Sequence, residues 1–339
     1  MSITETQLLE RGKKACYETF EHDKALSLYE EVITLSPEFA NAYAEKANVL
    51  RYQHKYQEAL DFANKAIDLD ENCWLGHFQK VRALVHLKRT EEAEELFTNF
   101  IADFYLRNPN KYDNNKEFLF QLATILCELK HYTKAIESFD ELIKIDSNKP
   151  IYYNNKASCF YYLKEYEKAI ECVTKAIELN PNYANAYNNN TNYLIDLKRY
   201  EEALESVNKA IDLNPNDPVF YNTKGNCLYC LERYEEALES VNKAIDLNPN
   251  CDNAYKNKAN CLYCLERYEE AIEYYTKAIE LNPNYANAYN SKASCFYCLE
   301  RYEEAIEYYT KAIDLNPDDL NSKEWKQKAL EKIGLKQDK

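Results

Sequence analysis

The chain has 339 residues, a net charge of −15 at pH 7 and a hydrophobic content of 46%. Its acidic balance argues against a nucleic-acid-binding protein, because phosphate backbones bind positively charged stripes and the sequence shows none. No apolar run approaches the roughly 18 residues of a membrane-spanning helix, and the charged segment from Met1 to Cys16 lacks the apolar stretch of a signal peptide. We therefore expect a soluble, cytoplasmic protein without membrane insertion.

A unit of 34 residues repeats along the chain, most clearly from residue 184 to residue 319. A fixed period of this size is typical of stacked-repeat proteins, in which each unit contacts only its neighbours. The first unit needs one extra residue between Gly12 and Ala25 to fit the register. The same register predicts nine units, which are 6–39, 40–73, 74–107, 116–149, 150–183, 184–217, 218–251, 252–285 and 286–319.

Each unit predicts two amphipathic helices. In the unit that begins at residue 184, apolar side chains follow helical spacing in the first half at Tyr187 and Leu194, and in the second half at Ala203 and Val207. Pro215 ends the second helix, because proline cannot continue it. Small residues recur where two helices must approach closely, at Ala157, Gly225, Ala259, Ala293, Ala169, Ala203, Ala237, Ala271 and Ala305.

The register divides the chain into four parts. Residues 6–107 hold three divergent units, residues 108–115 break the register, and residues 116–319 hold six further units. Residues 320–335 read as a capping helix with Trp325, Leu330 and Ile333 facing inward.

The helix before the register break is rich in aromatic residues, namely Phe97, Phe100, Phe104 and Tyr105. We favour a loop excursion in which these aromatics pack on the neighbouring repeat. The alternative is a lengthened helix that serves a partner.

The unit from residue 286 to residue 319 resembles the tetratricopeptide repeat, and the resemblance covers nearly the whole chain. Its matching residues are Tyr289, Ala293, Ala305, Tyr309, Ala312 and Pro317. Two positions depart from the family: lysine replaces the usual leucine at Lys224, Lys258 and Lys292, and glutamate replaces the usual turn glycine at Glu232, Glu266 and Glu300. The resemblance implies an all-α, right-handed superhelical solenoid of antiparallel helix pairs, about one superhelical turn long, that binds extended peptides on its concave face.

No catalytic, cofactor or metal site is predicted. Four glycines cannot supply a phosphate loop, and no His-Glu-x-x-His motif occurs. Three Cys-x-x-Cys pairs resemble zinc half-sites, but each lies inside a predicted helix and repeats with the unit; they are Cys227/Cys230, Cys261/Cys264 and Cys295/Cys298. We expect reduced, buried structural thiols.

The resemblance places the concave groove at the second, fifth, sixth, ninth, twelfth and thirteenth positions of each unit. Asparagine crowds these positions, at Asn154, Asn155, Asn188, Asn189, Asn192, Asn222, Asn226, Asn257, Asn260 and Asn290, and Lys256 stands among them. Tyrosine fills the twelfth position at Tyr161, Tyr229, Tyr263 and Tyr297. An amide both donates and accepts, so a ladder of amides would hold a peptide backbone. The alternative is a merely polar surface that reflects a nucleotide bias toward asparagine.

The third and fourth units carry apolar residues at groove positions, at Leu75, Phe78, Val85 and Phe120. They predict an apolar pocket that could anchor a ligand. The alternative is that local curvature buries them.

The sequence therefore predicts a non-enzymatic interaction scaffold or adaptor that binds a protein or peptide partner. A competing interpretation is a rigid structural subunit of a large assembly. A third is an adaptor for chaperone tails, but its carboxylate clamp is incomplete: Lys256 and Asn260 match the motif, whereas Ser291, Asn321 and Trp325 depart from it. The partner's identity and the oligomeric state are left open.

Overall fold

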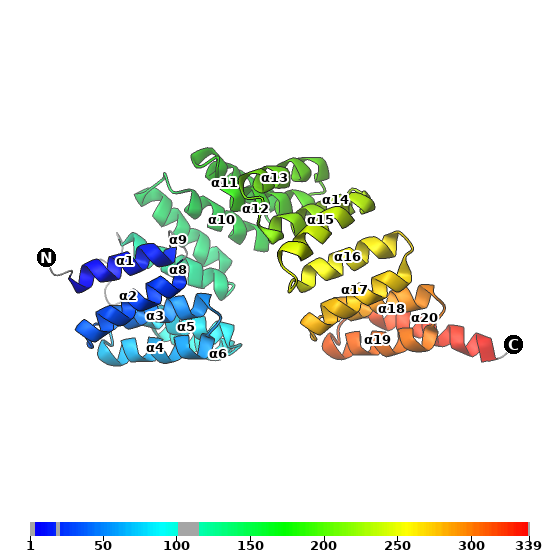
Figure 1. Cartoon of the computed structure of the whole chain (residues 1–339), viewed down its shortest axis with the longest axis horizontal. Coiled ribbons are helices and arrows are strands. Elements are labelled where there is room, and N and C mark those ends of the chain that lie inside the picture. Colours follow the sequence, from blue (N-terminus) through cyan, green and yellow to red (C-terminus); the bar gives the residue numbers. More distant parts are fainter. Residues whose placement is uncertain (1–3, 18–20, 101–114, 338–339) are drawn as a thin grey trace. The chain divides into compact units, whose positions relative to one another are not determined.

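The structure is a computed structural model that describes residues 4–17, 21–100 and 115–337. These residues form helices joined by short turns, with no strand among them (Figure 1). The predicted all-α helical repeat fold is confirmed. The handedness and the number of superhelical turns stay predictions.

The helices alternate between a first and a second helix of each repeat. The first helices are α1 (Glu5–Tyr17), α3 (Ala40–Tyr52), α5 (Trp74–His86), α8 (Lys116–Glu128), α10 (Pro150–Tyr162), α12 (Ala184–Asp196), α14 (Pro218–Cys230), α16 (Asp252–Cys264) and α18 (Ala286–Cys298). The second helices are α2 (His22–Leu35), α4 (Tyr56–Leu69), α6 (Thr90–Phe100), α9 (Tyr132–Ile145), α11 (Tyr166–Leu179), α13 (Tyr200–Leu213), α15 (Tyr234–Leu247), α17 (Tyr268–Leu281) and α19 (Tyr302–Leu315). A last helix, α20, spans Leu320–Gln337.

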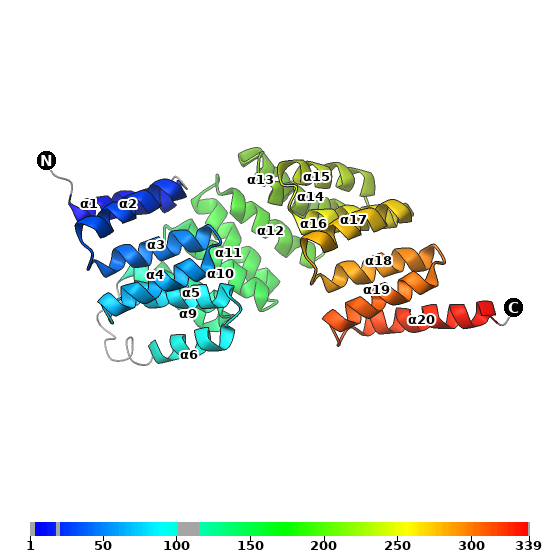
Figure 2. The same ribbon diagram turned by 60° about the horizontal axis from the view of Figure 1, so that its bottom comes forward.

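The chain separates into two compact units, residues 1–165 and residues 166–339. In the N-terminal unit the first helices pack in the order α1, α3, α5, α8 and α10. In the C-terminal unit α12, α14, α16, α18 and α20 follow one another in the same way, as Figure 2 shows for the last three. Each unit therefore presents a continuous surface made of first helices.

Small residues let the paired helices approach closely. Ala203, Ala237, Ala271 and Ala305 are completely buried at equivalent positions of the second helices. A Cβ atom added to Gly225 would collide with the side chain of Val241 across the pair. The structure thus explains why small residues recur at these positions.

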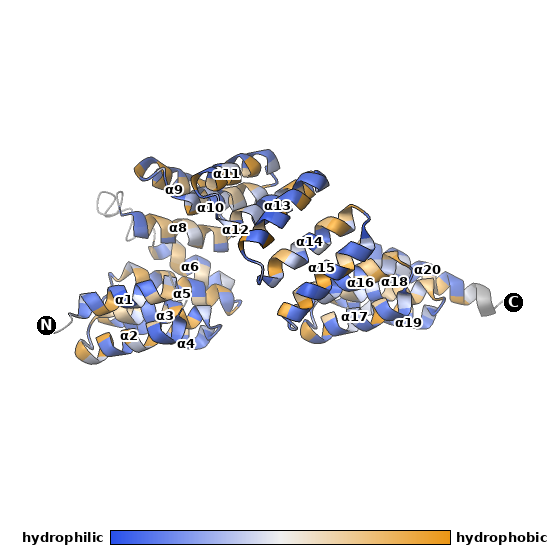
Figure 3. Ribbon diagram, turned by 45° about the horizontal axis from the view of Figure 1, so that its top comes forward, coloured by the Kyte–Doolittle hydropathy of each residue, from blue (hydrophilic) through white to orange (hydrophobic). Residues whose placement is uncertain are grey.

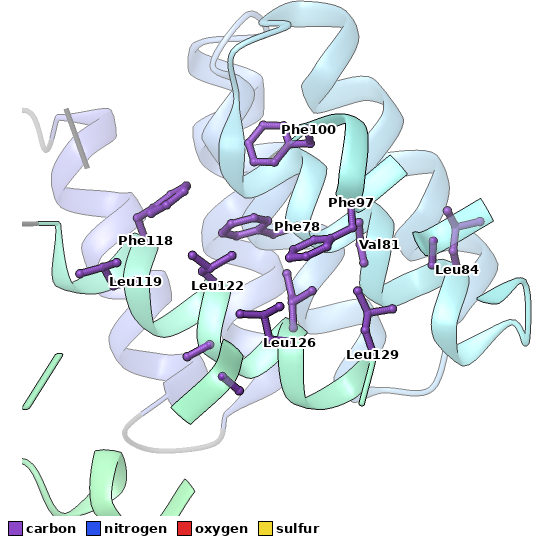
Figure 4. Close-up of a cluster of buried hydrophobic side chains, with 14 of the residues drawn as sticks. Phe78, Val81, Leu84, Phe97, Phe100, Phe118, Leu119, Leu122, Leu126 and Leu129 are labelled. Carbon is purple, nitrogen blue, oxygen red and sulfur yellow. The ribbon is translucent and has the colours of Figure 1, made fainter. Parts of the chain in front are cut away.

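The N-terminal unit contains a large aromatic core, shown in Figure 4. Phe97 and Phe100 of α6 pack with Phe78 of α5 and Phe118 of α8. The expectation that the aromatics of this helix pack on the neighbouring repeat is confirmed for Phe97 and Phe100.

Phe104, Tyr105 and residues 108–114 lie outside the described residues, so the division of the chain at 108–115 stays a prediction. Asn115, the first described residue after this gap, caps α8. Its side chain accepts a hydrogen bond of 3.0 Å from the backbone N–H of Phe118.

The turn inside most repeats contains one residue in the left-handed region. These residues have φ between 56° and 63°, and none is a glycine; they are His54, Lys88, Lys130, Lys164, Lys198, Glu232, Glu266 and Glu300. Glu232, Glu266 and Glu300 occupy the turn position where the tetratricopeptide repeat usually has glycine. Each of these turns therefore carries backbone strain that glycine would not.

Helix α20 closes the C-terminal unit through one narrow stripe. Ser322 and Ala329 are buried, and the ring of Trp325 lies 5.1 Å from that of Tyr297. Leu330 is 46% exposed, so the prediction that it faces inward was wrong. The reason is helical phase: residues 322, 325 and 329 share one face, and residue 330 is turned away from it.

The helices are amphipathic, and Figure 3 shows hydrophilic and hydrophobic residues on the same helices. Arginine–glutamate pairs recur on the exposed surface at the start of second helices, as in Arg233–Glu236 and Arg267–Glu270. Such exposed pairs contribute little to stability. None of the described helices combines the length and apolar composition that crossing a membrane requires.

Candidate functional site

The predicted asparagines line the first-helix surface, but several amides are already engaged within the protein. The side chains of Asn154, Asn188 and Asn257 are buried, and the others are half-buried, namely Asn155, Asn189, Asn192, Asn222, Asn226, Asn260 and Asn290. Asn257 donates a hydrogen bond of 2.9 Å to the amide oxygen of Asn222 in the preceding repeat. Part of the predicted ladder therefore joins repeats to each other.

A small cavity in the C-terminal unit brings three predicted residues together. It has a volume of about 270 Å³ and is lined by Tyr229, Asn260 and Tyr263, with Tyr275, Ser291 and Ser294. The hydroxyl of Tyr275 donates a hydrogen bond of 2.7 Å to the amide oxygen of Asn260.

The other predicted residues of the groove lie outside this cavity. Tyr161 packs on Tyr162 in the N-terminal unit, and Tyr297 packs on Tyr302. The Lys256 ammonium lies 5.8 Å from the ring centroid of Tyr285, and burial lowers the pKa of that ammonium.

The four residues predicted to form an apolar pocket do not come together around one opening. Phe78 and Leu75 are buried in the packing between helices. Val85 is half-buried against the same core as Phe78. Phe120 lines a cavity in the N-terminal unit. For Leu75 and Phe78 the structure agrees with the alternative interpretation, in which these side chains are buried between helices.

A large cavity lies mainly on the first helices of the N-terminal unit, with His22 of α2 at its wall. Its volume is about 790 Å³, and residues of α1, α3, α5, α8 and α10 line it. Its wall contains both charged and aromatic side chains. Arg51, Arg82, Gln121 and Thr124 occupy the same repeat positions that define the predicted groove, so these positions carry different chemistry in this unit. We call it the N-terminal cavity.

Arg82 joins α5 to α8 from inside the cavity wall. It is only 4% exposed. Its Nη1 donates a hydrogen bond of 2.5 Å to Oε1 of Gln121, and its Nη2 donates to the hydroxyl of Thr124. Its Nε lies 3.1 Å from Oε1 of Glu128. Burial lowers the pKa of the guanidinium against the opposing effect of Glu128, so these three groups are needed to compensate the buried charge.

A second buried charge, Glu45, lies on α3. It is 1% exposed and accepts a hydrogen bond of 2.9 Å from the hydroxyl of Tyr17. The Lys13 ammonium lies 3.6 Å from Glu45 Oε1 and 3.4 Å from Glu117 Oε1. Burial raises the pKa of Glu45 to about 7, although Lys13 and Tyr17 oppose the rise. Lys13 thereby links α1 to α3 and α8.

Arg51 carries the least compensated charge on the cavity wall. Its Nη2 donates a hydrogen bond of 2.8 Å to Asn48 Oδ1, and its guanidinium stacks 4.3 Å from the ring of Tyr52. Its buried Nε has no hydrogen-bond partner among the described residues. No described carboxylate lies within ion-pairing distance of it. The guanidinium therefore retains donors for a ligand.

The residues predicted from the sequence do not include the charged side chains of this cavity, although the sequence contains a signal for them. In the second and third units, the residues at the six groove positions include Glu45, Asn48, Arg51 and Arg82. Ionised groups at positions that other repeats fill with asparagine or tyrosine mark a candidate site, because burying charge is costly.

The cysteines show no metal-binding arrangement within the described ranges. No three histidine, cysteine or acidic side chains there gather around a point that could hold a metal ion, and the thiols are free. Burial raises the pKa of Cys227, Cys261 and Cys295 to about 12, so these thiols stay protonated at neutral pH.

Comparison with solved structures shows the fold. The Cut9–Hcn1 hetero-tetramer of the APC/C shares 14% identity, covering 91% of this chain and 59% of that chain, with a TM-score of 0.61. PilF of Pseudomonas aeruginosa shares 22% identity, covering 64% and 98%, with a TM-score of 0.55. YrrB, described as a repeat protein with an unusual peptide-binding site, shares 28% identity over 57% of this chain and 99% of that chain, with a TM-score of 0.43.

Sequence comparison shows the family. An Oryza sativa subsp. japonica protein, described as an SGT1 homolog, is 36% identical over 86 residues, which are 25% of this chain and 23% of that protein. The match therefore spans less than a quarter of that relative. Tetratricopeptide repeat models match residues 21–72, 116–149, 150–183, 184–217, 217–284 and 250–318. The chain belongs to the tetratricopeptide repeat family, whose members generally mediate protein–protein interactions.

Proposed function

We propose that the chain is a non-catalytic adaptor that binds an extended segment of a partner protein along its first helices. The N-terminal cavity is the principal contact, and the asparagine-rich first helices of the later repeats offer separate hydrogen-bonding groups. The observation that carries this proposal is the set of buried charges around a cavity of about 790 Å³.

The buried charges argue for a ligand because the fold does not need them. In a repeat protein an apolar core satisfies the packing of neighbouring helices, and an ion buried in its place costs several kcal/mol before compensation. Arg82 is almost completely buried in the wall of this cavity, and the equally buried Glu45 contacts Lys13 and Tyr17, which line it. Convergent polar groups around a well-formed cavity are typical of a binding site.

The cavity offers two kinds of contact to a peptide. The Arg51 guanidinium can donate hydrogen bonds to backbone carbonyls or to a polar side chain of the ligand. Tyr17, Tyr52 and Phe120 supply aromatic surface at a low entropic cost. Together these contacts would fix the direction and register of the bound segment.

A peptide-display library selected on the full chain tests the proposal. The affinity of each selected peptide is measured by fluorescence anisotropy. Arg51→Ala should weaken binding at least about tenfold, because it removes a charged hydrogen-bond donor from a partly desolvated contact. Arg233→Ala is the matched control, since this arginine is exposed beside a second helix, and it should leave the affinity unchanged. Circular dichroism should show equal helicity for both variants.

The same assay separates the competing interpretations. If Arg51→Ala binds like the parent and the triple variant Asn155→Ala, Asn189→Ala, Asn257→Ala loses affinity, the asparagine ladder is the principal contact and the assignment to the N-terminal cavity is wrong. If the library yields no binder, the adaptor proposal fails, and the interpretation as a rigid structural subunit is favoured.

A further inference from the structure

Two thiols from neighbouring repeats meet beside the N-terminal cavity. The Sγ atoms of Cys127 on α8 and Cys159 on α10 lie 3.1 Å apart. Cys159 is completely buried, whereas Cys127 is partly exposed. The first helices of two consecutive repeats therefore approach each other through a pair of sulfur atoms, and one of the pair is accessible from solvent.

Cys127 departs from the repeat pattern at this position. The twelfth residue of a unit is tyrosine at Tyr161, Tyr229, Tyr263 and Tyr297. The hydroxyls of Tyr229 and Tyr263 lie 3.6 Å from the sulfurs of Cys264 and Cys298 in the following repeats. In the fourth unit a thiol replaces the phenol, and its neighbour in the following repeat is also a thiol. Cys159 is the tenth residue of its unit, whereas Cys264 and Cys298 are thirteenth residues, so the two thiols form a contact of their own, with redox chemistry that a tyrosine–cysteine contact lacks.

We propose that Cys127 and Cys159 are a modification site, an oxidisable dithiol that a hydroperoxide converts into a disulfide. The sulfur of Cys127 attacks one oxygen of hydrogen peroxide, the O–O bond breaks and one water leaves, which gives a sulfenic acid. The sulfur of Cys159 then displaces the sulfenic oxygen as a second water and forms the S–S bond. Two thiols and one hydrogen peroxide thus give one disulfide and two waters.

The geometry needs only a small change to allow the bond. A disulfide places its sulfurs about 2 Å apart, so side-chain rotation must shorten the present separation by roughly 1 Å. The hydrogen bond with Cys159 and burial raise the pKa of the Cys127 thiol. Because the thiolate is the nucleophile, we expect slow oxidation that accelerates as the pH rises.

The disulfide would join α8 to α10 next to the cavity wall. Glu128, which contacts Arg82, directly follows Cys127 in the chain. The bond would close a loop that contains α9 and would stabilise the packing of the fourth unit on the fifth. The inference does not depend on the proposed binding function.

Peptide mapping of the full chain after treatment with hydrogen peroxide tests the inference. Free thiols are alkylated under denaturing conditions before digestion. We expect a cross-linked species that joins the peptides containing Cys127 and Cys159, and a rise in Tm of about 5 °C that a reducing agent reverses. Cys127→Tyr is the matched variant, because tyrosine stands at this position in the fifth, seventh, eighth and ninth units, and it should show neither effect.

Other outcomes would overturn the inference. These are alkylation of both cysteines to the same extent with and without peroxide, sulfinic acid at Cys127 without the cross-link, or a reversible rise in Tm that persists in Cys127→Tyr. Because a bulky tyrosine could disturb packing, Cys127→Ser serves as a second variant and should also remove the cross-link.

Discussion

Glu45 shows how one side chain couples the N-terminal cavity to pH. Its carboxyl group lies between the Lys13 ammonium and the Tyr17 hydroxyl, with Glu117 facing it from α8. Burial raises its pKa to about 7 in the folded chain from the ordinary value of 4.5. Between these two values the folded state binds more protons than the unfolded state does. The free energy of unfolding therefore falls as the pH rises through this window.

The variant Glu45→Gln tests this coupling, because glutamine cannot ionise. The stability of the variant relative to the parent should increase from about pH 5 to about pH 8, by up to about 3 kcal/mol. Urea denaturation at several pH values measures the difference. The parent chain, measured at the same pH values, is the reference. A pH-independent difference for Glu45→Gln would show that the carboxyl group is ionised at all these pH values.

At the scale of the element, the turns between paired helices carry the clearest strain. Glu232, Glu266 and Glu300 adopt φ near 59°, 59° and 56°, where a side chain clashes with the following carbonyl. Lysine and histidine hold the equivalent position in earlier repeats. The turn geometry is therefore imposed by the packing of the two helices and not by a glycine in the sequence.

Replacing one of these glutamates by glycine should stabilise the protein. For Glu232→Gly we expect a gain between a few tenths and about 1 kcal/mol in the free energy of unfolding, because relieved strain exceeds the greater entropy of glycine in the unfolded chain. The control is Glu239→Gly within α15, where the same substitution should cost about 1 kcal/mol. Chemical denaturation measures the free energy of unfolding of both variants. If both substitutions stabilised the protein, or if both destabilised it, the assignment of strain to the turn would be contradicted.

The helices could be predicted from the sequence because their determinants are local. The 34-residue period, the recurring alanines and the proline that ends six of the nine predicted units set the helix pairs. The N-terminal cavity depends on contacts that the period does not give. Arg82 and Gln121 are 39 residues apart, and Lys13 and Glu117 are 104 residues apart. The first contact joins α5 to α8 and the second joins α1 to α8. Counting repeat positions marks the charged residues, but it could not show which of them meet.

At the scale of the whole molecule, the two compact units present different chemistry on their first helices. The N-terminal unit carries buried charges around a cavity of about 790 Å³. The C-terminal unit carries amides and tyrosines around one of about 270 Å³. One unit therefore offers charged contacts to a ligand, and the other offers amide contacts. This contrast predicts that affinity depends chiefly on the N-terminal unit.

Photo-crosslinking with a library-selected peptide that carries a benzophenone group tests the central claim most directly. Mass spectrometry of the cross-linked full chain locates the bound segment. The account predicts adducts on α1, α3, α5 and α8, at residues around Arg51 and Phe120, and their loss in Arg51→Ala. Adducts confined to second helices, or an unchanged pattern in Arg51→Ala, would contradict it.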